Sequence, residues 1–287
     1  MSLIQRIKGK AQGACRLAKL TRVYGPLYPF TRTGRLRVFE YSFPFYSFPQ
    51  TYYLEWNAEK TCYEPGLCQH LIRRFQGRAI TFLDIGAHYG IFSALLGAMN
   101  SENRVYAFEP NPESFQTLKK NWDMNCRHGG CFQLALSDAE GSIPFHDKSM
   151  KVGADETGLR VPAIRFDEWR KTHPVQPDLV KLDVHGGEGM VLFGMQELLR
   201  EGGFDIYFEL HPQDILMKYT LKEIIALLYD NAWQMAELPD FRSDTLCEPV
   251  KLTPERRADL EDPARWTPQE TSARRMFYCT QRGATDA

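Results

Sequence analysis

Residues 80–90 read Ile80-Thr81-Phe82-Leu83-Asp84-Ile85-Gly86-Ala87-His88-Tyr89-Gly90. The first six are apolar or β-branched except for one carboxylate, which predicts a buried strand. A turn with two glycines follows, and residues 91–98 then carry apolar side chains at helical spacing. Strand, glycine turn and helix in this order are typical of a nucleotide-binding α/β unit.

The alternation of strand and helix continues along the chain. Asn111 is a natural N-cap with Pro112 at the first helical position, and Thr220 forms a capping box with Glu223 ahead of a later helix. Continuous apolar strands that alternate with helices indicate an α/β fold with a doubly wound, mostly parallel sheet. Seven strands are predicted, at Ile80–Gly86, Arg104–Glu109, Cys131–Leu136, Asp178–Asp183, Asp205–Leu210, Ala232–Leu238 and Met276–Thr280.

The chain before this pattern has a different composition. Residues 3–20 are predicted to form a basic helix, and residues 36–56 hold nine aromatic residues. The alternation over Arg37–Phe45 predicts a strand. Its rings either close one end of the core or line a pocket for a sugar or another flat ligand. We therefore predict an N-terminal extension, basic and then aromatic-rich, over residues 1–75.

The remaining residues, 76–287, are predicted to form the α/β domain. Two stretches interrupt its pattern, near residues 141–165 and 239–275. The first is expected to add a hairpin of Ser142–Phe145 and Leu159–Arg165. The second is polar and rich in proline, so we expect a long surface excursion.

The strand ends indicate where a ligand binds. In an open parallel sheet, ligands lie beyond the carboxyl ends of the strands. The first strand ends at the Gly86 turn, and the second ends at Glu109, whose carboxylate is placed to accept hydrogen bonds from both hydroxyls of a ribose. An acid about 20 residues after the glycine turn is typical of adenosine-containing cofactors in general.

The glycine pattern favours S-adenosylmethionine over a dinucleotide. A dinucleotide site requires Gly-x-Gly-x-x-Gly so that a pyrophosphate can lie on the helix N-terminus. Here His88 stands at the second glycine position, and side chains at 87 and 88 crowd that space. S-adenosylmethionine has no phosphate, and its amino-acid end can bind the amides of the turn. An NAD-dependent oxidoreductase remains the alternative.

Four motifs together resemble the FkbM-type class I methyltransferases. The resemblance covers about residues 60–236 in matching order, and it implies a seven-stranded, Rossmann-like fold that depends on S-adenosylmethionine. It also implies methyl transfer to hydroxyl groups, which predicts an O-methyltransferase acting on a sugar, glycan or glycosylated metabolite. The motifs are Phe82–Gly90, Val105-Tyr106-Ala107-Phe108-Glu109-Pro110-Asn111-Pro112, Ala135-Leu136-Ser137-Asp138-Ala139-Glu140-Gly141 and Val180-Lys181-Leu182-Asp183-Val184-His185-Gly186-Gly187-Glu188.

The resemblance also assigns residues to the cofactor. The glycine turn after the first strand would shape the methionine end of the pocket, Glu109 would hold the ribose, and the residues after the third strand would lie near the adenine. The expected cofactor-binding residues are Asp84, Gly86, Ala87, His88, Gly90, Glu109, Ser137, Asp138 and Asp183.

Four titratable residues follow the fourth and fifth strands, namely Asp183, His185, Glu209 and His211. They are expected to converge on the reactive end of the cofactor. An imidazole, with an ordinary pKa of about 6.5, is suited to accept a hydroxyl proton. We hypothesise that His211 or His185 is the general base, oriented by Asp183 or Glu209. The same quartet offers ligands for a divalent metal, but the sequence alone does not lead us to predict a metal site.

Position 185 departs from the family pattern. The family usually shows Asp-x-Glu-Gly-x-Glu after the fourth strand, and this chain has Asp183-Val184-His185-Gly186-Gly187-Glu188. An imidazole therefore replaces a carboxylate. This change is the best support for a second alternative, a catalytically silent cofactor-binding protein of the same fold.

Charge and composition bear on partners and location. The chain of 287 residues is 43% hydrophobic and has a formal net charge of −1, but residues 1–39 hold nine basic residues and no acidic one. The rest therefore has 26 basic and 36 acidic residues. The basic arm is compatible with peripheral contact with an anionic membrane, or with a helix packed on its own domain. The acidic body argues against nucleic acid as a partner.

The cysteines and the apolar runs favour a cytoplasmic protein. Seven scattered cysteines show no zinc-like spacing, as expected in a reducing compartment. No apolar run approaches the about 20 residues needed to cross a bilayer. The expected partner is a small-molecule or glycan acceptor.

Overall fold

The computed structural model describes residues 32–47, 62–146, 151–152, 159–213, 215–239, 241–243, 248–265 and 275–281 of the chain. The basic helix predicted over residues 3–20 lies outside the described residues, as do the aromatic residues after Ser47 and before Cys62. Among the described residues, no helix combines the length and the apolar character needed to span a bilayer.

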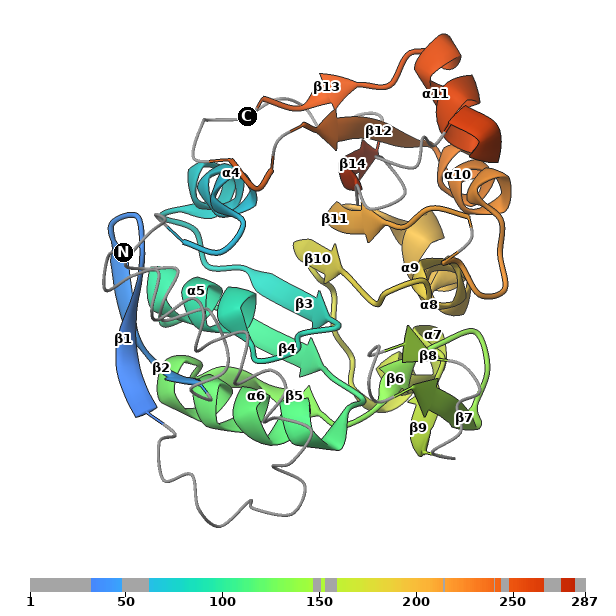
Figure 1. The fold of residues 1–287 in the computed structure, drawn as a ribbon. Coiled ribbons are helices and arrows are strands. Elements are labelled where there is room, and N and C mark those ends of the chain that lie inside the picture. Colours follow the sequence, from blue (N-terminus) through green and yellow to red (C-terminus); the bar gives the residue numbers. More distant parts are fainter. Residues whose placement is uncertain are drawn as a thin grey trace, which may run out of the picture.

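The central feature is an eight-stranded sheet with the strand order β13-β12-β14-β11-β10-β3-β4-β5 (Figure 1). Five neighbouring strands, from β11 to β5 in this order, are parallel, and β14 runs antiparallel to both of its neighbours. The fold is therefore the predicted doubly wound, mostly parallel α/β sheet, with the two-residue β13 as an additional edge strand. The strands are β3 (Thr81–Ile85), β4 (Arg104–Phe108), β5 (His128–Phe132), β10 (Leu179–Leu182), β11 (Asp205–Leu210), β12 (Trp233–Leu238), β13 (Val250–Lys251) and β14 (Arg275–Gln281).

Alternate residues of the central strands enter two separate hydrophobic clusters. In β10, Leu179 belongs to one cluster, whereas Val180 and Leu182 belong to the other. In β11, Tyr207 belongs to the same cluster as Leu179, and Phe208 belongs to the same cluster as Val180 and Leu182. Side chains of a strand alternate between the two faces of a sheet, so both faces are covered, which explains the continuous apolar runs in the sequence.

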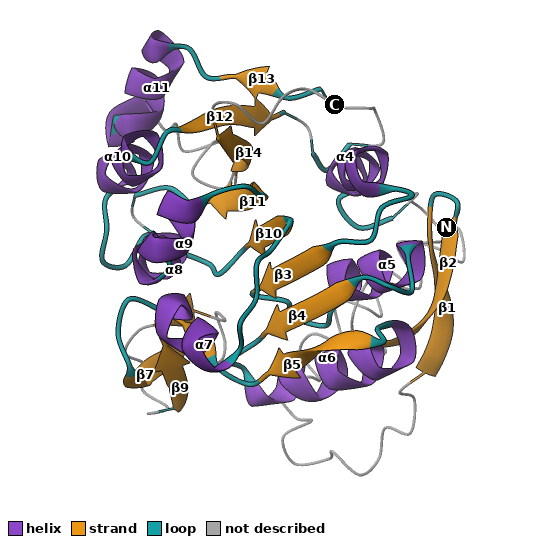
Figure 2. Cartoon of the chain, turned by 180° about the vertical axis from the view of Figure 1, so that it is seen from behind, coloured by secondary structure: helices purple, strands orange, loops and turns teal. Residues whose placement is uncertain are grey.

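Helices cover these faces. Figures 1 and 2 show α5 and α6 on the same face of β3, β4 and β5. Both predicted caps are confirmed: Asn111 accepts hydrogen bonds from two backbone N–H groups of α6, and Thr220 forms the capping box of α10 with Glu223. The helices are α4 (Pro65–Phe75), α5 (Ile91–Met99), α6 (Pro112–Asn125), α7 (Phe166–Thr172), α8 (Glu188–Gly194), α9 (Gln196–Glu201), α10 (Leu221–Asp230), α11 (Pro254–Glu261) and the 3₁₀ helix η2 (Pro263–Arg265).

The aromatic stretch forms a hairpin, and the prediction of one strand over Arg37–Phe45 is wrong. The chain reverses at Phe39, which has a positive φ of 51°, so that β1 (Arg32–Val38) pairs antiparallel with β2 (Tyr41–Ser47). Phe43 and Phe45 are buried in the cluster that also contains α4 and α5. These two rings therefore belong to the core and not to a pocket.

The third predicted strand is also corrected. Cys131–Leu136 does not form one strand, because β5 ends at Phe132 and β6 (Ala135–Leu136) belongs to a second sheet. This small sheet has the order β6-β9-β7-β8, with β7 (Gly141–His146), β8 (Lys151–Val152) and β9 (Arg160–Ile164). Figures 1 and 2 show it beyond the carboxyl ends of β4 and β5.

The segment after β10 forms two short helices, α8 and α9. They are separated at Met195, which is buried and has the non-helical angles φ −121° and ψ 30°. Gly202 ends α9 and has a positive φ. The described part of the 239–275 segment contains β13, α11 and η2 and buries Leu252 and Leu260.

Candidate functional site

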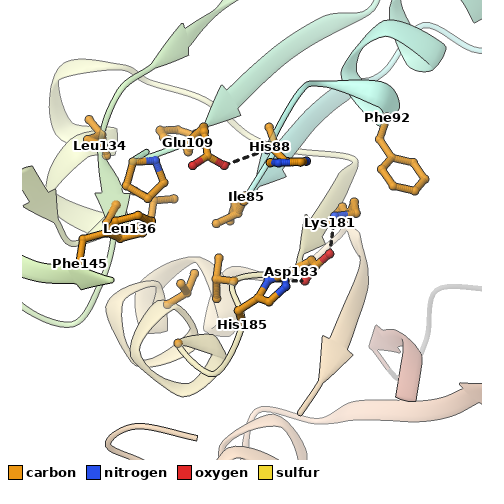
Figure 3. A pocket seen from close by; sticks show the side chains of 18 of the residues that line it. Ile85, His88, Phe92, Glu109, Leu134, Leu136, Phe145, Lys181, Asp183 and His185 are labelled. Atoms are coloured by element: carbon orange, nitrogen blue, oxygen red, sulfur yellow. Dashed lines mark hydrogen bonds and ion pairs between the residues drawn. The ribbon is translucent and has the colours of Figure 1, made fainter. Parts of the chain in front are cut away.

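A cavity of about 260 Å³ lies at the carboxyl ends of the parallel strands (Figure 3). Its lining includes the turn after β3, the end of β4 and the loop after β10. The small sheet contributes an apolar wall through Ile143 and Phe145 of β7. The cavity is therefore at the place that the strand ends predict.

The glycine turn after β3 shapes one side of the cavity. Gly86 has a φ of +76°, and a Cβ there would collide with the backbone oxygen of Asp183. The N–H groups of Gly86 and Ala87 both donate to the carbonyl of Phe108, 3.0 Å away, which ties the turn to the end of β4. A side chain at position 86 is thus excluded by the close approach of β10.

Gly90 lies outside the lining and begins α5. Its φ is +81°, and a Cβ would come within 2.6 Å of Leu118 of α6. His88, which stands where a dinucleotide site has glycine, does line the cavity. Burial lowers the pKa of His88 to about 4, so its ring is neutral at neutral pH. The ring stacks on Tyr89 at 3.7 Å between centroids.

Glu109 presents a carboxylate to the cavity. One oxygen accepts the backbone N–H of His88 at 2.9 Å, and the other accepts that of Asn111 at 2.8 Å (Figure 3). Burial raises the pKa of Glu109 to about 7, against the lowering effect of these two N–H donors. Each oxygen keeps lone-pair capacity beyond its one bond. Glu109 is therefore fixed in place and able to accept further hydrogen bonds.

Asp84 is next to this site but outside the lining. Its Oδ2 accepts the backbone N–H of Ser93 at 3.1 Å and the hydroxyl of Ser93 at 2.7 Å. Ser93 lies in the first turn of α5, where N–H groups lack partners within the helix. Asp84 thus caps α5 from the neighbouring strand and holds the glycine turn between β3 and α5.

Ser137 and Asp138 also lie outside the lining. Ser137 is buried. Asp138 accepts hydrogen bonds from Lys218 at 2.5 Å and from the hydroxyl of Tyr219 at 2.6 Å. The cavity wall nearest to them is formed by Leu134, Ala135 and Leu136. This part of the chain therefore borders the cavity through apolar residues.

The second half of the site is the β10–β11 cluster, defined as Asp183, His185, Glu209 and His211. The structure brings all four together, as predicted. Asp183 and His185 line the cavity, and an Asp183 oxygen lies 3.5 Å from Nδ1 of His185. His185 has a positive φ of 54°, as sharp loops require. Glu209 and His211 are fully buried behind them.

Asp183 is ionised in this setting. Burial by itself would raise its pKa, but the ammonium of Lys181, at 3.6 Å, holds the pKa of Asp183 well below its usual range. Lys181 is buried, lies in the cavity lining, and has its ammonium 4.9 Å from the centre of the Phe92 ring. Lys181 is thus paired with the carboxylate of Asp183.

His211 is held by Glu188, a contact that was not predicted. Its Nδ1 lies 2.8 Å from Oε1 of Glu188, and its Nε2 lies 3.7 Å from Oε2 of Glu209. Glu188 was visible in the fourth motif, and its spacing to the strand end was the available signal. Arg242, which lies 2.7 Å from Glu209 and 3.5 Å from Glu64, has no local signal, since it comes from a distant segment.

Fold and site together define a class: an open α/β protein with a cavity at the carboxyl ends of its parallel strands, the place where such sheets bind ligands. The model of the methyltransferase FkbM domain matches residues 84–235, just over half of the chain. The chain belongs to the FkbM methyltransferase family.

One curated relative is the hexuronic acid methyltransferase AglP of Haloferax volcanii. It is 28% identical over an alignment of 141 residues, and the match covers 46% of this chain and 58% of that protein. The chain thus spans less than two thirds of the length of this relative.

Solved structures of methyltransferases are more distant. The methyltransferase FkbM of Methylobacillus flagellatus has a TM-score of 0.41 at 16% identity, covering 70% of this chain and 43% of that one. An S-adenosylmethionine-dependent methyltransferase of Agrobacterium tumefaciens has a TM-score of 0.42 at 12% identity, and the match covers 89% of this chain and 72% of that one. The family assignment comes from the domain match.

Proposed function

We propose that the chain transfers a methyl group from S-adenosylmethionine to a hydroxyl group of a sugar, as a free sugar, a glycan or a glycosylated metabolite. The observation that carries the proposal is the cavity itself, which is lined by Glu109 on one side and by Asp183 and His185 on the other (Figure 3). The side with Glu109 suits the ribose of a nucleoside, and the side with Asp183 and His185 carries ionisable groups. Membership in the FkbM family supplies the reaction class.

The residues around the cavity fit the cofactor. The two oxygens of Glu109 each accept one backbone N–H, which leaves capacity for two ribose hydroxyls. The apolar wall of Leu134, Leu136 and Phe145 suits the flat adenine ring. S-adenosylmethionine would supply an electrophilic methyl group there. The side chain of His88 in the turn disfavours a pyrophosphate, and hence NAD.

The acceptor hydroxyl must lose a proton as it is methylated. His185 is the member of the imidazole pair that lines the cavity, and the ionised Asp183 beside it can orient it. Without a bound cation, His185 is therefore the group that takes this proton. His211 is buried behind it and acts on the acceptor only through its neighbours.

Two further observations favour a sugar acceptor. Tyr63 and Phe92 line the cavity with ring centroids 6.1 Å apart, and an aromatic face suits the apolar face of a sugar ring. The relative AglP is named for a hexuronic acid, which is a sugar. Contact of the basic N-terminal arm with a membrane stays a proposal, since residues 1–31 lie outside the described part of the chain.

Cofactor binding and acceptor class can be tested separately. Calorimetry with S-adenosylhomocysteine should give saturable binding, whereas NAD should give none. Incubation with methyl-labelled S-adenosylmethionine and a panel of neutral sugars, uronic acids and polysaccharides should then label a sugar. An alkali-stable label identifies an ether at a hydroxyl, and an alkali-labile label identifies an ester. Absence of heat with S-adenosylhomocysteine would refute the proposal, and so would labelling of non-carbohydrate material alone.

A further inference from the structure

We infer that Asp183, His185 and His211 form a binding site for one divalent transition-metal ion at the carboxyl ends of β10 and β11. Each offers one ligand atom, and these atoms lie within 4.8 Å of one another. Two imidazoles and one carboxylate are a donor set that suits ions such as Mn²⁺, Fe²⁺, Co²⁺ or Zn²⁺. The inference rests on the proposed function, because the ion would act on the acceptor of that reaction.

His211 is already arranged as a metal ligand. Oε1 of Glu188 accepts the backbone N–H of Gly186 at 3.0 Å, so the same oxygen is an acceptor toward Nδ1 of His211 at 2.8 Å. His211 therefore donates from Nδ1, and in its neutral form, the form that binds a metal, its lone pair is on Nε2. A carboxylate that fixes an imidazole through the opposite nitrogen is the usual support of a metal-binding histidine.

The lone pair of His211 has no hydrogen-bond donor opposite it. Nε2 is buried and lacks a hydrogen-bond partner among the described residues, and its near neighbour is a carboxylate oxygen of Glu209 at 3.7 Å. In the neutral form of His211, these two lone-pair-bearing atoms repel each other at this distance in a buried setting. A cation next to them would remove that repulsion.

Asp183 and His185 connect this buried nitrogen to the cavity. Oδ1 of Asp183 also lacks a hydrogen-bond partner within the described chain. Around a bound ion with ligand distances of about 2.1 Å, ligand atoms lie about 3 Å apart, so the site must contract on binding. His185, with a quarter of its side chain exposed, has room to turn toward the other two.

The local charge balance favours a cation. Within the described residues, the surroundings of the site contain more carboxylates than ammonium and guanidinium groups. Burial of unbalanced carboxylates is costly, and a divalent cation offsets it. The carboxylates are those of Glu64, Asp84, Asp183, Glu188 and Glu209, and the cationic side chains are those of Lys181 and Arg242.

The position of the site indicates the chemistry of its ligand. Asp183 and His185 line the cavity, so the open coordination positions of the ion would face the acceptor. Two neighbouring oxygens of a sugar, either adjacent hydroxyls or a hydroxyl beside a carboxylate, can chelate such an ion. A hydroxyl bound to a divalent ion loses its proton more readily. With an ion bound, His185 would be a ligand; the ion would lower the pKa of the hydroxyl, whose proton would then leave to solvent water.

The test uses Co²⁺ as a spectroscopic probe. The full-length protein is treated with a chelator, dialysed and titrated with Co²⁺ while visible absorption is recorded, and Mn²⁺ binding is measured by calorimetry. We expect one equivalent to bind. His211→Ala and His185→Ala should each weaken binding at least 10-fold, and Glu188→Gln should weaken it about 10- to 100-fold through loss of orientation. His128→Ala, an exposed histidine at the start of β5, is the matched control and should bind normally.

Two results would overturn the inference. One is the absence of Co²⁺ and Mn²⁺ binding to the wild-type protein at 1 mM ion (about the upper limit of a specific site). The other is equal affinity in His185→Ala, which is partly exposed and should fold even if His211→Ala does not. Calorimetry with S-adenosylhomocysteine on the same metal-free protein separates the two proposals. Cofactor binding without metal binding removes only the metal site, and metal binding without cofactor binding removes the proposed function.

Discussion

Buried carboxylates are compensated differently in the two halves of the cavity. At the ends of β3 and β4, Asp84 and Glu109 are held by backbone N–H groups from residues within ten positions of themselves or from the adjoining turn. At the ends of β10 and β11, Asp183 is balanced by Lys181, two residues earlier in the chain, and Glu209 is balanced by Arg242 from a distant segment. The first half is fixed mainly by backbone hydrogen bonds, and the second mainly by the charges of side chains.

This difference separates two tasks. A rigid half that is anchored by the backbone suits a constant cofactor. A half made of titratable side chains suits a reaction in which charge changes. The following predictions test whether binding belongs to the first half and turnover to the second, in order of decreasing effect.

The largest effect is expected for His185→Gln, which removes proton acceptance and metal ligation but keeps a polar side chain. Turnover of the sugar acceptor should fall about 100- to 10,000-fold, because this is the usual contribution of a group that activates a hydroxyl. Affinity for S-adenosylhomocysteine should stay within about threefold of wild type. Steady-state kinetics and calorimetry measure the two quantities, and a loss of cofactor affinity with normal turnover would reverse the assignment of the halves.

Glu109→Ala should mainly weaken binding of the cofactor. Hydrogen bonds to a charged group contribute about 1.5–3 kcal/mol each, so affinity for S-adenosylhomocysteine should fall about 100-fold. Glu113→Ala removes an exposed carboxylate from the first turn of α6, four residues further along the chain, and is the control. Unchanged affinity in Glu109→Ala would show that the ribose does not bind at the end of β4.

The raised pKa of Glu109 predicts a pH dependence of stability. Burial raises the pKa of this group to about 7, above its unfolded value, so between these two values the folded state binds more protons. Stability contributed by Glu109 is therefore present at low pH and lost as pH rises toward 7. The free energy of unfolding of Glu109→Gln, measured relative to that of the wild type, should therefore increase by on the order of 2 kcal/mol when the pH is raised from 5 to 8. Urea unfolding at both pH values measures this difference, and a constant difference would contradict it.

A smaller effect is expected for Arg242→Ala. It leaves the fully buried Glu209 without a guanidinium 2.7 Å away. Loss of one partner of a buried pair costs about 3–5 kcal/mol, but Arg242 is nearly half exposed, so about 1–2 kcal/mol is expected. The double variant Arg242→Ala/Glu209→Gln should recover most of this loss. Denaturant unfolding of both variants tests it, and equal stability of single and double variants would show that the pair is not coupled.

The sequence predicted the elements whose signals are local. The strand and glycine turn at 80–90, the caps at Asn111 and Thr220, and the acid at Glu109 all depend on a few consecutive residues. The errors arose where a local pattern had two solutions. The alternation over Arg37–Phe45 continues across a reversal at Phe39, and the apolar run from Cys131 to Leu136 is divided between two sheets.

The candidate site divides in the same way. That Asp183, His185, Glu209 and His211 would meet was predictable, because the carboxyl ends of neighbouring parallel strands share one edge of the sheet. Which of them face the cavity was not predictable. Asp84 turned out to bond to Ser93, and His211 to Glu188, since side-chain direction depends on what packs against each strand end.

The sequence by itself determined the class of fold, the edge of the sheet that holds the site and the acid at the end of β4. These follow from periodicity and from turn chemistry, which act over a few residues. Only the tertiary structure decided the balance of charge behind the cavity, because Glu64 and Arg242 reach it from separate segments. Electrostatic energies depend on distance in space and on exclusion of water, and neither quantity is encoded in separation along the chain.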